Sequence, residues 1–171
     1  MSVAAVVSAI AIPQTLVTLD SIRTAAAARY LASRVMLARA LAVQRTAAVA
    51  LRFDTDSRGF RFAAFQDGNH NGVRSVDIDA NVDRQIEPPV RLPDQFPGVD
   101  FGLTIEGQSS NPIQLGGTTL LTFTPEGTAT SGSLYVRGRK GVQYAVRVLG
   151  ATGRARVQRY DERQHAWTDT L

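Results

Sequence analysis

The feature that most constrains the fold is a run without glycine or proline from Thr15 to Ala50. Alanine, leucine and arginine dominate this run, and all three favour helices. Small and branched side chains recur in it at steps of three and four residues, which places them on one helix face. We call this face the inner seam: Thr24, Ala28, Leu31, Val35, Ala38 and Ala42. The spacing predicts one long helix whose inner seam packs against the rest of the chain.

The apolar segment that precedes this run, MSVAAVVSAIAIP, has three interpretations. A secretory signal peptide needs a basic start, whereas the first basic residue is Arg23. A complete transmembrane helix needs about 20 apolar residues, whereas the stretch from Met1 to Ile12 spans only about 18 Å as a helix. The third interpretation, which we favour, is the latter part of a longer hydrophobic helix whose beginning is missing.

After Thr46 the hydrophobic period changes from that of a helix to two. Short alternating segments separated by glycine and proline turns, with no helical pattern between them, indicate antiparallel strands. The predicted strands cover residues 47–53, 59–66, 99–105, 119–124, 133–138, 142–149 and 154–160. Residues 67–98 are polar and show little periodicity. The sequence therefore predicts an α+β fold with two parts, a helix in residues 1–45 and a β-rich head of antiparallel sheets in residues 46–171.

The composition excludes several kinds of chemistry. The 171 residues fit one domain with a sizeable core. No cysteine is present, so the sequence offers no disulfide and no thiolate metal site. The two histidines, His70 and His165, have neither metal-ligand spacing nor a nucleophile motif around them. We therefore expect a protein that is not an enzyme and that uses no cofactor and no small-molecule substrate.

One loop begins like a calcium-binding EF-hand. Oxygen donors alternate at Asp67, Asn69 and Asn71, and Gly72 occupies the sixth position. The twelfth position should carry an acidic residue, but it is Ile78. Because asparagine and glycine tolerate positive φ, the favoured interpretation is a plain turn. The loop stays a weak candidate metal site.

Positive charge gathers near the C-terminus of a chain whose net charge is +4. Between Ser131 and Arg163, eight basic residues face two acidic ones. Arg154 and Arg156 alternate on a predicted strand, so their guanidinium groups would share a face about 7 Å apart, a spacing that suits phosphates along a nucleic-acid strand. With Arg159 they form the candidate nucleic-acid contacts. The competing interpretation is a solvated sheet edge.

Several segments, in order along the chain, carry a family resemblance. SAIAIP is similar to the prepilin membrane helix up to its proline, here Pro13, and LARALAVQRTAAVALRF to a helix-to-strand passage. Three later segments are similar to parts of the same proteins: a loop, a strand with its turn, and a terminal strand. These segments are FQDGNHNG, LTFTPEGTATSGSLYV and TGRARV. The chain thus resembles the type IV pilin-like proteins and, within them, the GspH/FimT minor pseudopilin family. The Gly-Phe-Thr-Leu-x-Glu processing signature of prepilins does not occur in it.

The resemblance implies a minor pseudopilin of the type II secretion system, a structural subunit in protein secretion. It implies a methylated inner-membrane protein with one transmembrane helix and a head in the periplasm. Its partners would be other pseudopilins. The helix positions that would contact lipid and partner helices are Val3, Val6, Val7, Ile10, Ile12 and Pro13. The alternative is a FimT-like minor pilin that binds DNA for uptake through Arg154 and Arg156.

Overall fold

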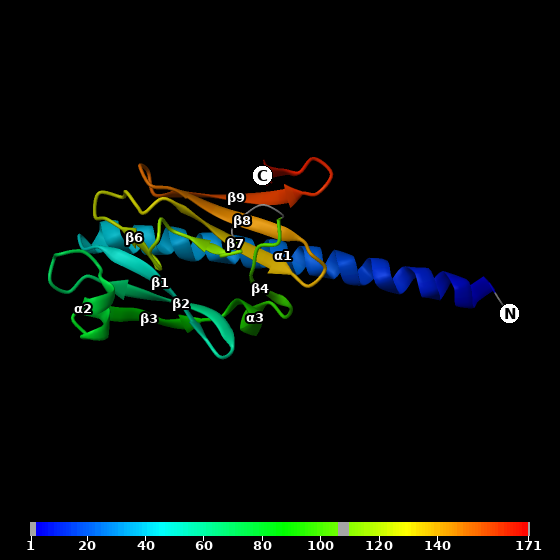
Figure 1. Ribbon diagram of the computed structural model, residues 1–171, viewed down its shortest axis with the longest axis horizontal. Coiled ribbons are helices and arrows are strands. Elements are labelled where there is room, and N and C mark those ends of the chain that lie inside the picture. The colour runs from blue at the N-terminus through cyan, green and yellow to red at the C-terminus, as the bar shows by residue number, and fades with distance from the viewer. Residues whose placement is uncertain (1–2, 106–109, 171) are drawn as a thin grey trace.

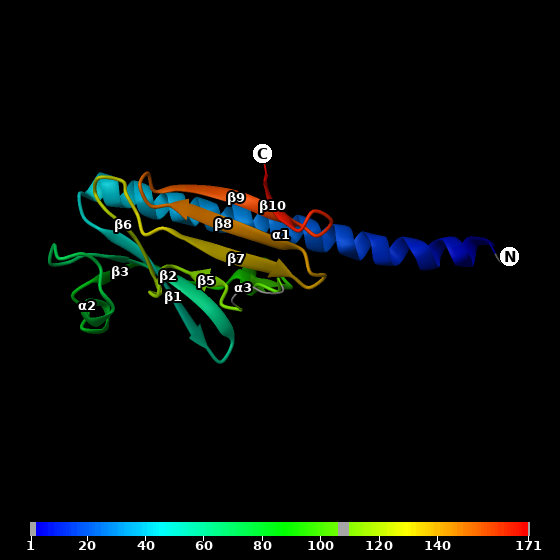
Figure 2. The same cartoon turned by 45° about the horizontal axis from the view of Figure 1, so that its top comes forward.

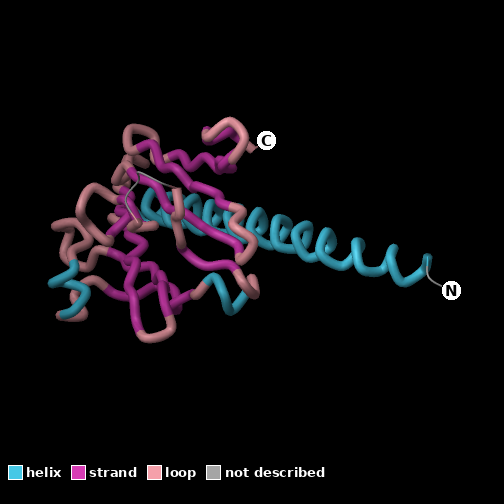
Figure 3. Tube along the Cα trace, turned by 45° about the vertical axis from the view of Figure 1, so that its right-hand side comes forward, coloured by secondary structure: helices cyan, strands magenta, loops and turns pink. Residues whose placement is uncertain are grey.

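The computed structural model describes residues 3–105 and 110–170, with side chains from residue 17 onward. A long helix, α1 (Val3–Arg45), is followed by a head built of antiparallel strands, so the predicted α+β fold is confirmed. The C-terminal part of α1 lies along the head, and its N-terminal part extends beyond it as a free rod (Figures 1 and 3). Among the described residues, no helix combines the length and the apolar character needed to cross a bilayer.

Two sheets make up the head. The first has the strand order β3-β2-β1-β6 and the second β10-β9-β8-β7-β4, with β5 also paired to β7. The strands of the first sheet are β1 (Val49–Asp56), β2 (Gly59–Gln66), β3 (Arg84–Val90) and β6 (Leu120–Phe123). Those of the second are β4 (Val99–Phe101), β5 (Ile113–Gln114), β7 (Gly132–Gly138), β8 (Gln143–Leu149), β9 (Arg154–Asp161) and β10 (Ala166–Asp169).

The inner seam of α1 forms the centre of the hydrophobic core. All six of its predicted residues are buried, none more than 2% exposed, so this prediction is confirmed. Leu31 and Val35 belong to one cluster with side chains of both sheets, such as Leu51 of β1 and Val146 of β8. Alanines in the seam bring the helix axis close to the strands, and α1 lies along both sheets (Figure 2). The helix thereby holds the two sheets together.

The structure differs from the prediction in the stretch of residues 67–98. This stretch contains β3 and two short helices, α2 (Ser75–Asp79) and α3 (Leu92–Gln95). Pro88 and Pro89 lie within β3, which tolerates them because it is the edge strand of its sheet. The pairing of β3 with β2 also has register shifts, which interrupt the alternation of apolar and polar residues by which a strand is predicted from sequence.

Other strand predictions had wrong limits. The strand predicted over residues 99–105 ends at Phe101, because the chain then leaves the edge of β7 and returns to it only as β5. The strands β5 and β10 were not predicted. Both are short, and β10 is held mainly by its pairing with β9, as in Trp167 opposite Tyr160.

Candidate functional site

The outer face of α1, opposite the inner seam, carries apolar side chains that the head leaves exposed. Ile22, Met36 and Val43 are 60%, 36% and 49% exposed. They follow each other at multiples of seven residues, or about two helical turns, and so lie in one row. Leu19 and Leu37 are exposed beside this row. We call these five side chains the outer stripe. Exposed Arg29 lies in the same row, seven residues from both Ile22 and Met36, so the stripe is apolar with one charge in it. Exposed apolar side chains that gather on one face mark surfaces that contact another molecule.

A buried carboxylate fixes α1 where the helix leaves the head. The two oxygens of Asp20 accept the backbone N–H groups of Arg139 and Lys140, at 3.0 and 2.9 Å, in the turn between β7 and β8. The side chain of Thr24 is buried beside it. Gly138 permits this approach, since a Cβ atom there would collide with Asp20 and Thr24. Sequence reasoning missed Asp20; an isolated acid in an alanine-rich helix was the available signal.

The helix positions predicted to contact lipid or partner helices are Val3, Val6, Val7, Ile10, Ile12 and Pro13. The backbone of this segment is helical and continuous with the part of α1 that packs on the head. Its side chains lie outside the described residues, so their contacts stay a prediction.

The three candidate nucleic-acid contacts lie on two different faces of β9. Ala155 and Val157 pack toward the core, so Arg154 and Arg156 point to the outer face of the sheet and Arg159 to the side of the helix. Arg156 lies opposite Arg147 of β8, and its Nη1 is 3.8 Å from Asp169 Oδ2. The guanidinium of Arg147 in turn lies over the ring of Trp167, 5.7 Å from its centroid. The structure therefore brings together Arg154 and Arg156 but not Arg159.

The loop that begins like an EF-hand is tied together by its own carboxylates. Asp67 is buried, and its oxygens accept the backbone N–H groups of Asn69, His70 and Gly72 at 2.8–3.1 Å. Buried Asp83 accepts two more N–H groups, at the two ends of the loop. The Asn69 side chain accepts the N–H of Asn71. In the described part of the chain, no three acidic or histidine side chains gather closely enough to hold a metal ion.

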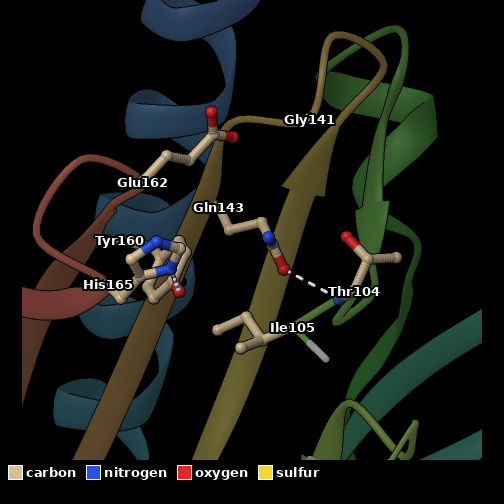
Figure 4. A pocket seen from close by; sticks show the side chains of 7 residues that line it. All are labelled: Thr104, Ile105, Gly141, Gln143, Tyr160, Glu162 and His165. Atoms are coloured by element: carbon tan, nitrogen blue, oxygen red, sulfur yellow. Dashed lines mark hydrogen bonds between the residues drawn. The ribbon is translucent and has the colours of Figure 1, made fainter. Parts of the chain in front are cut away.

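A hollow of about 810 Å³ opens beside the ends of β8 and β9 (Figure 4). Tyr160 and His165 lie together on one wall, with the phenol oxygen 3.4 Å from the imidazole Nδ1. On the other wall, the side-chain oxygen of Gln143 accepts the N–H of Thr104, 2.9 Å away. Glu162 also lines the hollow, with its carboxylate directed away from Tyr160 and His165. The described lining offers an imidazole and a phenol but no nucleophile aligned with a base, so it indicates no catalytic constellation.

Two carboxylates near the tip of the β1–β2 hairpin have pKa values shifted in opposite directions. The N–H of Arg58 and then the guanidinium of Arg91 lower the pKa of Asp56. Partial burial raises the pKa of Asp100, against the smaller effects of the Phe101 N–H and Arg91. Arg91 is itself buried and also contacts the carbonyl of Gly59. This cluster joins the hairpin to β4. Asp100 also lines a hollow of about 250 Å³ with Arg137 and Arg139, but the described lining holds no second carboxylate or histidine, so we assign the cluster a structural role.

The sequence and the fold were compared with known proteins. A sequence model of the family described as type II transport protein GspH matches residues 27–153. Among solved structures, the chain is similar to the minor pseudopilin EpsH from the type 2 secretion system of Vibrio cholerae. The identity is 12% and the TM-score 0.47, over 87% of this chain and 97% of that one. Comparison with curated proteins gave no match. Because the family match extends from the packed part of α1 to the turn before β9, the chain belongs to the GspH family of type II transport proteins.

Proposed function

We propose that the protein is a minor pseudopilin, a structural subunit of the pseudopilus in type II secretion. The observation that carries the proposal is the outer stripe of α1, in a chain of the GspH family. The inner seam of this helix is already buried in the head. A second, mostly apolar row, interrupted by Arg29 and at a spacing close to the 3.5-residue period of packed helices, supports packing against neighbours in a bundle.

In this proposal, the N-terminal rod of α1 anchors the subunit in the inner membrane. Its apolar positions Val3, Val6, Val7, Ile10 and Ile12 contact lipid and the helices of other pseudopilins, with Pro13 at the end of the apolar part. The head then lies on the periplasmic side. The work of the protein is assembly by burial of helix surface, and it involves no catalysis.

Cysteine cross-linking tests the proposed contacts with no background, because the chain contains no cysteine. We expect Ile22→Cys and Met36→Cys to form cross-links with single cysteines placed in the helices of other pseudopilins of the same system. The matched control is Leu149→Cys on β8, at an apolar position as exposed (60%) as Ile22. Cross-links from Leu149→Cys in place of the helix positions would contradict the proposal.

A secretion assay tests whether the outer stripe matters for transport. Replacing Ile22 and Met36 by Glu places two charges in a helix interface, where an uncompensated buried charge is strongly unfavourable. We expect these variants to fold and to fail to restore secretion to cells that lack the protein. The control, Leu149→Glu, should restore it. Normal secretion by the Ile22→Glu, Met36→Glu variant would overturn the proposal.

The DNA-capture alternative through Arg154 and Arg156 stays a prediction. Neither the family match nor the arrangement of the three arginines favours it, because Arg159 lies on another face and Asp169 approaches Arg156. A gel shift at two salt concentrations checks it. Loss of a salt-sensitive shift in Arg154→Ala and Arg156→Ala would support this function.

A further inference from the structure

A second hollow, of about 540 Å³, lies where α1 leaves the head. Its lining comes from the helix, the turn that joins β7 to β8, β9, β10 and the turn between these two strands. The two turns lie on the side from which the N-terminal rod of α1 extends (Figures 1 and 2). We call this hollow the exit groove. Its lining includes Val17 of the helix, Lys140, Arg159, Arg163, Glu162 and Thr168.

Three cations of the exit groove are free to bind an anion. Lys140, Arg159 and Arg163 are all exposed, and none of them forms an ion pair within the described part of the chain. Asp20 anchors the backbone N–H of Lys140, and so keeps this lysine beside the helix exit. The arrangement therefore presents positive charge at a fixed place relative to the axis of α1.

Two carboxylates line the same groove and must be counted against these cations. Asp161 Oδ1 accepts the backbone N–H groups of Arg163 and Gln164, at 2.8 and 3.4 Å, so it is engaged in the turn between β9 and β10. Glu162 is exposed and reduces the positive potential. The remaining excess of positive charge favours an anion that carries one or two charges over a polyanion.

The groove also has an apolar side. Val17 precedes Thr24 by seven residues, about two turns, so it continues the line of the inner seam beyond the edge of the head. It has lost the cover of the sheets and is 49% exposed. A ligand with a charged group and an apolar body fits such a pair of surfaces.

The position of the groove along the helix suits one source of such a ligand. This step rests on the proposed function, in which the apolar part of α1 ends near Ile12 at the membrane surface. Val17 follows Ile12 by five residues, or about 8 Å of helix. The headgroup layer of a bilayer is about 5–8 Å thick on each side. The cations of the exit groove would therefore lie at the level of the lipid phosphates.

We propose that the exit groove binds the headgroup phosphate of an anionic phospholipid. Lys140, Arg159 and Arg163 contact the phosphate, and the upper part of the lipid lies against Val17. Basic side chains at an anionic membrane surface each strengthen binding severalfold. The contact fixes the head against the membrane and so sets the angle at which α1 leaves it.

The single tryptophan of the chain reports this docking. Trp167 of β10 directly precedes Thr168, which lines the groove. The full chain is inserted into lipid nanodiscs made of phosphatidylcholine alone or with phosphatidylglycerol. A fraction of the lipids carries a nitroxide on the headgroup, which quenches nearby fluorescence. We expect the ratio of docked to undocked heads to be about tenfold higher with phosphatidylglycerol. This preference should fall as salt rises from about 0.05 to about 0.5 M.

Variants assign the effect to the groove. Lys140→Gln, Arg159→Gln and Arg163→Gln together should abolish the preference for phosphatidylglycerol. The matched control carries the same change of charge at exposed arginines at the far end of the head: Arg74→Gln, Arg84→Gln and Arg154→Gln. It should keep the preference, and Glu162→Gln should increase it. Thermal melts of all variants check that the fold is retained.

The outcomes separate this inference from the proposed function. Full insertion into the nanodiscs with equal quenching in both lipids would overturn the groove but leave the membrane anchor in place. Failure to insert into either lipid would overturn the anchor and the groove together. Loss of cross-linking to another pseudopilin in the groove variant, with no lipid preference in the wild type, would identify a protein carboxylate as the ligand and would also overturn the proposal.

Discussion

The two faces of α1 use similar side chains for different purposes. On the inner seam, Leu31 and Val35 are fully buried against both sheets. On the outer stripe, Leu37 and Met36 are more than a third exposed. Burial of the inner seam stabilises the subunit. The outer stripe is exposed in the isolated chain, so covering it with a partner would lower the free energy further. In the proposed function, one helix therefore serves two interfaces, one within the subunit and one between subunits.

The same substitution on the two faces gives the largest expected contrast. Leu31→Ala removes fully buried methyl groups and leaves a cavity, so the free energy of unfolding should fall by about 2–5 kcal/mol. Leu37→Ala removes the same atoms from a surface position and introduces a good helix former, so the change should stay within about 0.5 kcal/mol. Denaturation with urea measures both.

Cross-linking between subunits should respond to these two substitutions in the opposite order. Leu37→Ala should weaken cross-linking between subunits, whereas Leu31→Ala should alter it only through loss of fold. Equal destabilisation by the two substitutions would show that the outer stripe is buried within the subunit, and the contrast between the faces would be lost.

Much of this contrast could be predicted from the sequence, because it depends on a local period. Residues three and four positions apart share a helix face whatever surrounds them, so the inner seam from Thr24 to Ala42 was found without the structure. The end of the helix is also visible in the sequence. The change of period after Thr46 predicts a helix in residues 1–45, and α1 ends at Arg45, where Thr46 adopts a positive φ of 51°.

The contacts that position the candidate surfaces could not be predicted, because they join residues far apart in the chain. Asp20 bonds to Arg139 and Lys140 across more than a hundred residues. The separation of Arg159 from Arg154 and Arg156 follows a simple alternation that was available in the sequence. Which side faces the helix, however, is decided by the packing of Ala155 and Val157.

Asp20 provides the next largest effect and tests the polar end of the inner face. Asp20→Ala removes the acceptor for two backbone N–H groups, so unfolding should become easier by about 1–3 kcal/mol. Asp20→Asn keeps one acceptor oxygen and should cost less. The exposed neighbour Arg23 gives the control, since Arg23→Ala should change stability by no more than about 0.5 kcal/mol. Hydrogen exchange at the Lys140 amide should accelerate in Asp20→Ala. Unchanged exchange would mean that the turn between β7 and β8 is stable without the Asp20 contacts.

The flank between the two faces should give the smallest effect. Arg34 of α1 pairs with Glu87 of β3, and both side chains are about one-fifth exposed. Ion pairs at partly exposed sites contribute about 0.2–1 kcal/mol. Part of the attraction is offset here, because Arg34 Nε is buried with no hydrogen-bond partner among the described residues. A double-mutant cycle with Arg34→Gln and Glu87→Gln isolates the coupling, which should weaken in high salt. A coupling energy larger than the loss of stability in Asp20→Ala would contradict this prediction. The Arg34–Glu87 pair would then belong to the interface within the subunit, and only the outer stripe of α1 would be left for partners.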